Sequence, residues 1–448
     1  MAEITRRDLG RATGIVTALS YSRILGANEQ VRMGYVGVGN RGDQVHDAFL
    51  ESGGNQTVAV CDLRDDYMDF AVHKSRAAPK KYRDYRKLLE DKDVDAVVIA
   101  TPDHWHALMF ADACRTGKDV YVEKPLSRTV AEGRKMVEIA AETKRVVQVG
   151  IQRRSSPFLK EAAELVRSGG IGPVTVARSF HVINMWPNGI GNPPDSAPPN
   201  EKLWDEWLGP APRVPYNVNR TFYDFRWFYD YSGGQITNFG VHYMDMLRWC
   251  LGKDAPRAVT AMGGKYAVAD DREIPDTLEA LWQFDNGNAP ATMVTFSQYS
   301  CNGASWNAQN SEMELRGAKG TMYLHGSRWE VLPEKITDKI SPARTPLDRV
   351  TEKSYNPSRH LAMEPKSAKG SSDTALHTRN FLDCVKSRAK CNCDVETGHR
   401  STAATLIANI ALKTKSYLEW DGRAERFTNN DAANKLLQYK YRSPYKLT

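Results

Sequence analysis

The sequence predicts an α/β protein with an N-terminal doubly wound parallel sheet and a C-terminal α+β domain that carries a large, mostly antiparallel open sheet. Short apolar runs alternate with helical patterns as far as residue 150, which is typical of βαβ units. From about residue 157, several strands follow one another along the chain. At 448 residues the chain is long enough for two hydrophobic cores. We expect a separate segment at 1–27, a first domain at 28–150 and a second domain at 151–448.

The first element is a short apolar strand at 33–38, and a glycine-rich turn, Gly37-x-Gly39-x-x-Gly42, closes it. Gly37 permits the tight turn, Gly39 lets the backbone approach a pyrophosphate, and Gly42 lets the following helix pack close to the strand. That helix, expected from about residue 43, points its free N–H groups at the phosphates. The turn therefore predicts a Rossmann dinucleotide site. Its expected cofactor-binding residues are Gly37, Gly39, Asn40, Arg41 and Gly42.

The second strand, expected at 57–61, ends at Asp62, twenty residues after Gly42. A carboxylate at this place accepts hydrogen bonds from the adenosine ribose hydroxyls, and it repels a 2′-phosphate. Asp62 therefore favours NAD over NADP as the cofactor. Arg64 lies close in the sequence and could soften that preference.

Polar residues follow three further strands, which we expect at 94–100, 119–122 and 146–150, with helices at 103–115 and 130–144. Ligands bind at the carboxyl ends of the strands in such a sheet. The site residues expected there are Thr101, Pro102, Glu123, Lys124, Gln152 and Arg153. His104 and His106 follow the Thr-Pro turn, where each could contact the cofactor or cap its own helix.

The second domain starts with a helix at 158–167 and a strand at 174–182, before a long ordered loop at 185–217 that is rich in Pro, Asn, Trp and Gly. We expect a polar surface excursion at 333–372. The remaining expected strands are 257–263, 277–284, 291–299, 312–316 and 321–325, and the remaining helices are 374–388 and 399–418.

A second candidate motif runs from Gly233-Gly234 to His242. Asn238 and His242 are four residues apart, so on one helix they share a face. The ordinary pKa of histidine suits proton transfer near neutrality, although a histidine packed in the core is the alternative. Asp245 lies one turn further, where it could orient the His242 ring or be a plain helix acid.

The stretch before this motif is rich in aromatic residues, and sugar rings stack on such side chains while Arg and Asn bind the hydroxyls. The expected substrate contacts here are Trp186, Tyr223 and Arg226. Packing of the long loop is the alternative role for these side chains.

Four elements give the chain a resemblance to the Gfo/Idh/MocA oxidoreductase family: the glycine turn, Thr101-Pro102, Glu123-Lys124-Pro125, and Gly233-Gly234 leading to His242. The resemblance implies that Lys124 contacts the substrate hydroxyl and the cofactor, and that the Lys124-Pro125 peptide is a candidate cis bond. It also implies a homo-oligomer, a dimer or tetramer formed through the exposed face of the second sheet. Many members carry aspartate where this chain has Asn238, and because an amide is no base, proton transfer shifts to His242 with Lys124 as partner.

The expected function is an NAD-dependent oxidoreductase that moves a hydride between a ring secondary alcohol of a sugar, sugar derivative or glycoside and a tightly bound nicotinamide cofactor. The expected catalytic residues are Lys124, Asn238 and His242. One alternative is an NAD-dependent glycoside hydrolase that oxidises its substrate transiently, but its usual Tyr-x-Thr-His-Gly segment is replaced by the sequence 239–242, Phe-Gly-Val-His. The other alternative is a non-catalytic nucleotide-binding protein.

Composition excludes several classes of protein. The net charge of +7 is spread along the chain, which does not predict nucleic-acid binding. No apolar run reaches the roughly 20 residues of a membrane span. The seven scattered cysteines do not predict a disulfide framework, and Cys391-Asn-Cys393 lacks a second ligand pair, so we expect no metal site.

The N-terminus, Thr-Arg6-Arg7-Asp-Leu-Gly followed by a weakly apolar stretch at 12–21, resembles a twin-arginine export signal. We therefore expect an exported, periplasmic protein; the alternative is a basic tail on a cytoplasmic one. Because no free NAD pool exists outside the cytoplasm, an exported enzyme would hold its cofactor tightly and regenerate it with a second substrate or an external acceptor.

Overall fold

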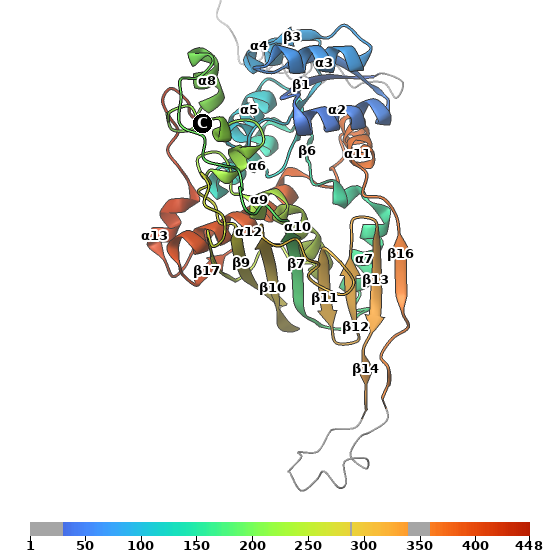
Figure 1. Cartoon of the computed structure of the whole chain (residues 1–448). Helices are drawn as coiled ribbons and strands as arrows, with labels where there is room; N and C mark the ends of the chain where they lie inside the picture. Colours follow the sequence, from blue (N-terminus) through green and yellow to red (C-terminus); the bar gives the residue numbers. More distant parts are fainter. Residues whose placement is uncertain (1–29, 287–288, 339–358) are drawn as a thin grey trace, which may run out of the picture.

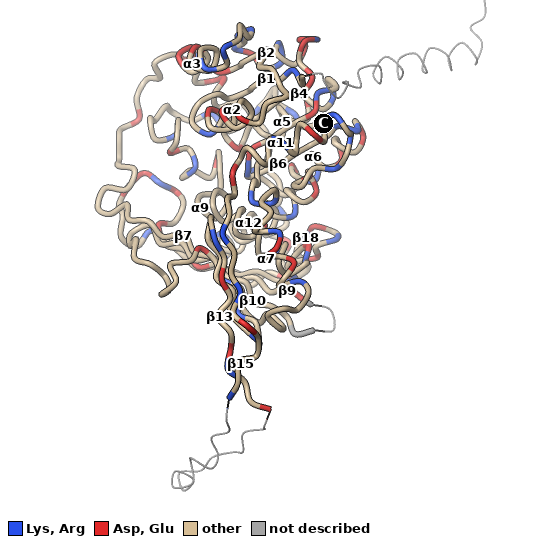
Figure 2. The backbone as a smooth tube through the Cα atoms, turned by 90° about the vertical axis from the view of Figure 1, so that its right-hand side faces the viewer, with Lys and Arg blue, Asp and Glu red and all other residues tan. Residues whose placement is uncertain are grey.

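The computed structural model describes residues 30–286, 289–338 and 359–448, and it contains two large sheets with helices packed on them (Figure 1). The expected export signal at 1–27 lies outside the described residues. Among the described residues, no helix has the length and apolar character that crossing a membrane requires. Positive and negative residues are interspersed along the backbone (Figure 2).

The first sheet is parallel and has the strand order β3-β2-β1-β4-β5-β6, which confirms the predicted doubly wound fold. Its inner strands are apolar on both faces because helices cover both sides. The strands are β1 (Val31–Val36), β2 (Asn55–Cys61), β3 (Lys80–Tyr82), β4 (Ala96–Ile99), β5 (Asp119–Val122) and β6 (Val147–Val149). The helices are α2 (Asn40–Ser52), α3 (Asp65–Ser75), α4 (Tyr85–Glu90), α5 (Asp103–Arg115) and α6 (Val130–Thr143). The order reverses between β1 and β4, and ligands bind such sheets at this point.

The second sheet has ten strands in the order β16-β13-β12-β11-β7-β10-β9-β8-β17-β18. Only β7 and β10 pair in parallel among the described strands of this sheet, which confirms the mostly antiparallel prediction. The strands are β7 (Val174–Val182), β8 (Ala258–Gly264), β9 (Thr277–Asn286), β10 (Ala289–Tyr299), β11 (Met313–Gly317), β12 (Gly320–Leu324), β13 (Arg328–Pro333), β16 (Lys366–Lys369), β17 (Leu418–Asp421) and β18 (Arg426–Phe427). A separate pair, β14 (Lys335–Ile336) and β15 (His360–Leu361), extends beyond the sheet (Figure 1).

Helices cover one face of this sheet. Trp282, Phe284 and Phe296 from the sheet pack in one core with Leu247 and Ile407 from the helices. The helices are α7 (Pro157–Arg167), α9 (Gln235–Asn238), α10 (Gly240–Leu251) and α12 (Val395–Thr414). Helix α12 is buried on nearly all sides, as its lack of amphipathic periodicity requires.

Helix α11 (Thr374–Ser387) returns from the second sheet to the first domain, where it lies beside α2 (Figure 1). Phe381 packs edge-to-face on Phe49 and Tyr121 in the core of the parallel sheet. The last described elements are α13 (Asp431–Asn434) and a short 3-10 helix, η5 (Lys435–Leu437). The first domain is thus completed by a segment far from it in the sequence.

The predicted loop at 185–217 contains a helix, α8 (Glu201–Leu208), so this part of the prediction is wrong. Asn200 caps the helix by accepting a hydrogen bond from the Leu203 N–H, and Trp204 and Leu208 form its buried side. The helix is too short for a clear periodic signal among the surrounding prolines. The predicted set also lacks strands β3, β13, β14, β15, β16, β17 and β18. Strand β16 lies within the predicted surface excursion at 333–372 but forms one edge of the second sheet.

Candidate active site

The glycine turn leaves no room for side chains. Gly37 has a φ of +82°, and a Cβ there would lie 2.8 Å from the Ala100 carbonyl at the end of β4. A Cβ at Gly42 would lie 2.0 Å from the Gly37 oxygen. Helix α2 begins at Asn40, earlier than the predicted start near Asp43, so its N-terminus lies directly on the turn. This cradle fits the close backbone approach that a pyrophosphate needs.

Asp62 lies directly after β2, as predicted. Its Oδ2 accepts from the Val38 N–H at 2.9 Å and its Oδ1 from the Arg64 N–H at 3.0 Å, and burial raises its pKa. Each oxygen keeps acceptor capacity for a ribose hydroxyl. The Arg64 guanidinium lies over the Tyr67 ring at 4.2 Å and over the Phe222 ring at 5.1 Å.

Lys124 and Asn238 are brought together from positions 114 residues apart: Lys124 Nζ donates to Asn238 Oδ1 at 2.6 Å. The Asn238 amide in turn donates to Gln235 Oε1 at 3.0 Å. Burial lowers the pKa of Lys124 to about 8, against the opposing charge of Glu123. The Lys124–Pro125 peptide is cis, as the resemblance implied.

His242 lies in the first turn of α10, whereas Asn238 ends α9, so the expectation that one regular helix carries both is wrong. The His242 N–H bonds the Phe239 carbonyl three residues back, which is a tighter turn than that of an α-helix. The ring Nδ1 is buried and has no hydrogen-bond partner among the described residues. Burial, and then the positive charges of Lys124 and Arg153, hold the pKa of His242 well below its usual range. The ring is therefore neutral near pH 7, and it is a weaker base than the histidine of ordinary pKa that the sequence led us to expect.

Asp245 is occupied elsewhere. Its carboxylate accepts from Arg154 Nε at 2.8 Å and Nη2 at 3.1 Å, and from Ser401 Oγ at 2.7 Å. Asp245 therefore neither orients the His242 ring nor is a plain helix acid, the two roles considered from the sequence. It forms a buried ion pair that joins helix α10 to a 3-10 helix, η1 (Gln152–Ser155).

Arg41 and Glu123 form an ion pair beside the reacting groups, with Arg41 Nε 2.9 Å from Glu123 Oε1. The other Glu123 oxygen accepts the Lys124 backbone N–H at 3.1 Å, so Glu123 fixes the chain from which Lys124 extends. Gln152 Oε1 and one terminal nitrogen of Arg153 are buried and have no hydrogen-bond partner among the described residues. Buried polar atoms normally have partners, and these two fit contacts to a ligand.

The two histidines after the Thr-Pro turn have protein partners. His106 contacts the carbonyl oxygens of Pro125 at 2.8 Å and Thr101 at 2.9 Å, and so joins the loops after β4 and β5. His104 Nε2 lies 3.1 Å from the Trp207 carbonyl, and burial lowers its pKa to about 3. Contacts of His104, His106, Thr101 and Pro102 with a cofactor stay predictions.

The aromatic residues divide into two groups. Trp186 is 62% exposed and Tyr223 is 50% exposed, and the Arg226 guanidinium lies 3.5 Å from the centre of the Tyr223 ring. Arg226 Nε is buried without a partner among the described residues, which fits a ligand contact. Three other aromatic side chains of this stretch pack as a core instead: Trp204, Trp207 and Trp227.

Sequence reasoning missed Asp103, the first residue of α5. Its buried carboxylate accepts from Ser232 Oγ at 2.6 Å, and burial raises its pKa while the nearby charges of Lys124 and Arg226 oppose the shift. An acidic residue directly after the Thr-Pro turn, at the carboxyl end of a parallel strand, was the available signal. Asp103 adds a carboxyl group to the site.

Two family models match the chain. The NAD-binding Rossmann fold of the oxidoreductase family matches residues 31–151, and its C-terminal alpha/beta domain matches residues 159–271 and 362–447. The chain is 38% identical to glycosyl hydrolase family 109 protein 1 of a Shewanella strain over 125 residues, 26% of this chain and 27% of that protein. It is 32% identical to inositol 2-dehydrogenase of Salmonella typhimurium over 153 residues, 34% of this chain and 46% of that protein. The aligned region thus spans less than half of either relative.

A solved structure of levoglucosan dehydrogenase in complex with NADH and levoglucosan has the same fold, with a TM-score of 0.61 and 15% identity over 87% of this chain and 99% of that chain. The two family models together match well over half of the chain, in the domain order that the structure shows. The chain therefore belongs to the Gfo/Idh/MocA family of oxidoreductases and carries that family's NAD-binding Rossmann domain.

Proposed function

We propose that this protein is an NAD-dependent oxidoreductase of a ring secondary alcohol in a sugar, sugar derivative or glycoside. The observation that carries the proposal is the contact of Lys124 with Asn238 at 2.6 Å, at the carboxyl end of the parallel sheet. Beside it lies the buried His242 ring nitrogen, which has no partner in the part of the chain that the structure describes. The relatives add support, because inositol 2-dehydrogenase and levoglucosan dehydrogenase are both named for cyclic polyhydroxy compounds.

Each of the three residues has a role that follows from its chemistry. A bound nicotinamide dinucleotide supplies the hydride acceptor. Lys124, as the cation, donates a hydrogen bond to the substrate oxygen and stabilises the negative charge that develops there. His242, which its lowered pKa keeps neutral, accepts the hydroxyl proton. Asn238 holds the ammonium group of Lys124 in place by accepting its hydrogen bond. Because the amide is neutral, it places no negative charge beside the ammonium group.

The cofactor we propose is NAD rather than NADP. The partly exposed Asp62 carboxylate is anchored by two backbone N–H groups, so it cannot easily turn away from a 2′-phosphate. Arg64, the nearest cation, is drawn to Asp66 and to the rings of Tyr67 and Phe222. A guanidinium held in this way is less available to bind a phosphate group.

We also propose that the dinucleotide is held firmly and recycled by a second substrate or an external acceptor. The supporting feature is a strap, residues 217–232 of the second domain. The strap contacts Arg64 through Phe222, and its last residue, Ser232, contacts Asp103. It therefore extends from the residues beside the ribose-binding carboxylate to those around Lys124. Phe222 has a φ of +49°, a strained value for a residue other than glycine, which fits a functional role.

We also propose that the protein is exported by the twin-arginine route and assembles into a dimer or tetramer. The open face of the second sheet supports assembly, because Met262 on β8 is 76% exposed and Met293 on β10 is 44% exposed on that face. The arginine pair at 6–7 supports export.

The test uses the purified full-length protein, a panel of cyclic polyols and sugars, and the absorbance of reduced nicotinamide, with and without a redox dye as external acceptor. We expect at least one compound to reduce bound nicotinamide. Because a relative is named as a glycosyl hydrolase, nitrophenyl glycosides belong in the panel. Release of nitrophenol without net reduction of the dye would replace our proposal with transient oxidation and hydrolysis. No reduction and no hydrolysis by a protein that binds NAD would favour a non-catalytic role.

A further inference from the structure

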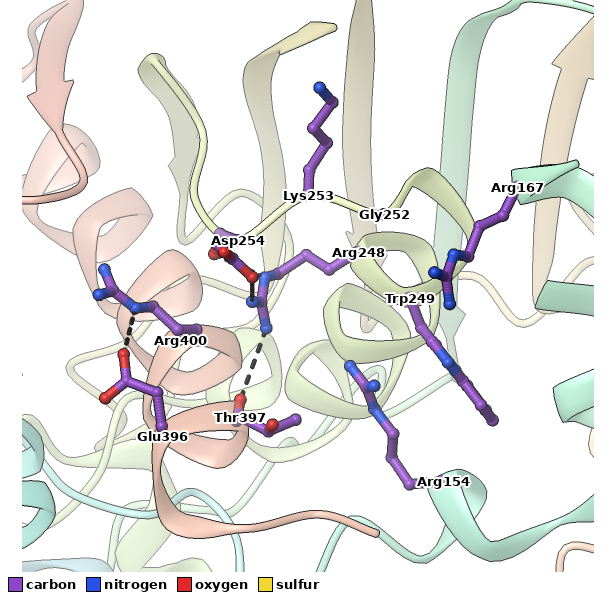
Figure 3. A pocket seen from close by; sticks show the side chains of 10 residues that line it. All are labelled: Arg154, Arg167, Arg248, Trp249, Gly252, Lys253, Asp254, Glu396, Thr397 and Arg400. Carbon is purple, nitrogen blue, oxygen red and sulfur yellow. Dashed lines mark hydrogen bonds and ion pairs between the residues drawn. The ribbon is translucent and has the colours of Figure 1, made fainter. Parts of the chain in front are cut away.

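A cavity of about 320 Å³ lies outside the proposed active site, between the C-terminal ends of α7 and α10 and the first turns of α12 (Figure 3). Its volume is in the range of small-molecule sites. Five of its lining side chains are cations from four different elements or their ends: Arg154, Arg167, Arg248, Lys253 and Arg400. Nothing in the proposed reaction uses this cavity.

The cations around the cavity outnumber their carboxylate partners. Arg154 pairs with Asp245, and Arg248 lies 3.7 Å from Asp254. Arg400 pairs with Glu396 at 2.6 Å and Glu425 at 3.2 Å, and those two carboxylates are shared with Arg134.

Arg167 and Lys253 form no ion pair with any residue that the structure describes. The cavity wall therefore carries two positive charges without a matching carboxylate. Figure 3 shows Arg154, Arg167 and Arg248 approaching it from three separate segments.

Arg248 is the most deeply buried of these cations, with 4% of its surface exposed. Burial lowers its pKa to about 10, with the charge of Asp245 opposing the shift and the charge of Arg154 adding to it. Its guanidinium donates to Ser401 Oγ at 2.6 Å and to the Asp254 carbonyl at 2.9 Å, and an anion in the cavity would add to the charge compensation that Asp245 and Asp254 provide. The Trp249 indole also lines the cavity, and the Arg154 guanidinium lies 4.9 Å from the centre of its ring.

Helix capping gives only part of the explanation. Cations stabilise the C-terminal ends of helices, and Arg167 and Arg248 lie in the last turns of α7 and α10. Two carbonyls in the last turn of α10, those of Arg248 and Trp249, already accept the N–H groups of Lys253 and Gly252. Capping also does not require a cavity or the convergence of cations from α12 and η1.

We propose that this cavity binds a tetrahedral oxyanion, phosphate or sulfate, either free or as the charged group of a small molecule. Guanidinium groups present paired N–H donors that match the oxygens of such groups. Two unmatched positive charges balance one dianion. The cavity is larger than the oxyanion alone, which leaves room for a molecule that carries it.

The test is a calorimetric titration of the full-length protein with inorganic phosphate, at constant low ionic strength because exposed charges are screened by salt. The variant Arg167→Ala/Lys253→Ala removes the two cations without ion pairs, whose side chains are not part of the core. The matched control is Lys160→Ala, which removes a cation from the same helix α7 but outside the cavity. Thermal unfolding with and without phosphate provides a second measurement for each protein.

We expect phosphate to bind and stabilise the wild type and the control, and the double variant to bind at least about tenfold more weakly. Titrations with sulfate and with glucose 6-phosphate distinguish the sources. Equal affinities for phosphate and glucose 6-phosphate assign the cavity to the free oxyanion. Tighter binding of glucose 6-phosphate that is lost in the double variant assigns it to a larger ligand, whereas tighter binding that the double variant keeps belongs to the active site. Absence of binding to the wild type overturns the proposal. Unchanged binding by the double variant also overturns it, since the phosphate would then lie elsewhere, for example on the glycine turn.

Discussion

Replacing Asn238 by aspartate tests the electrostatics of the proposed site. The change puts a negative charge at the oxygen that now accepts the Lys124 ammonium at 2.6 Å. An opposite charge at this distance raises the pKa of a lysine by roughly 1 to 3. The pKa of Lys124 starts at about 8, since burial disfavours its cation. The variant should therefore keep Lys124 charged to about pH 9 or above.

The assay is the pH dependence of kcat for wild type and Asn238→Asp. If cationic Lys124 holds the substrate oxygen, wild-type activity falls as the pH rises through about 8, because the cation is lost there. In the variant this fall should move upward, while activity below pH 7 is kept. The isosteric Asn238→Leu is the control, as it removes the hydrogen bond without adding charge. An alkaline limb that is the same in wild type and Asn238→Asp would refute the reasoning. Activity that rises through pH 8 in the wild type would instead make neutral Lys124 the base.

Three further predictions concern the cofactor and the location of the protein. Asp62→Ala should reduce the ratio of NAD to NADP affinity at least about tenfold by fluorescence titration, since a charged acceptor is lost; tighter NADP than NAD binding by the wild type would contradict this role. Phe222→Ala should speed the release of bound NADH roughly 2- to 30-fold in stopped-flow fluorescence, the range for a lost cation–π contact, whereas Phe70→Ala, an exposed ring on α3, should not. Replacement of the arginine pair at 6–7 by lysines should leave the protein in the cytoplasm by cell fractionation; normal export of that variant would exclude the signal.

The sequence predicts the sheet of the first domain well, because its signals are local. Apolar runs mark β4 and β5, and the spacing of Gly37, Gly39 and Gly42 is required by backbone contacts within the turn. Such features depend on neighbours a few residues away. The return of α11 to this domain has no local signal in the sequence. Phe381 looks like any aromatic residue of a helix, and only the structure shows that it packs on Phe49.

The site was predicted as a set of residues but not as a set of contacts. The strand-end rule indicated Lys124, and the motif from Gly233-Gly234 to His242 indicated Asn238 and His242, although one regular helix does not carry both. Local sequence patterns could not show that Asp245 pairs with Arg154, because the two residues are 91 positions apart in the chain. Burial also lies outside sequence reasoning, and it is burial that lowers the pKa of Lys124 and His242 and so decides which of them is charged.

The central claim is tested most directly by hydride transfer in a single turnover, with wild type, Lys124→Ala and His242→Ala each loaded with NAD. We expect both variants to bind NAD nearly as tightly as the wild type, because the glycine turn and Asp62 are untouched. Their rates of nicotinamide reduction should fall by about 10²–10⁴, the usual effect of removing a positioned acid or base. A near-native rate for His242→Ala, with an unchanged pH profile, would contradict the assignment of His242 as the proton acceptor.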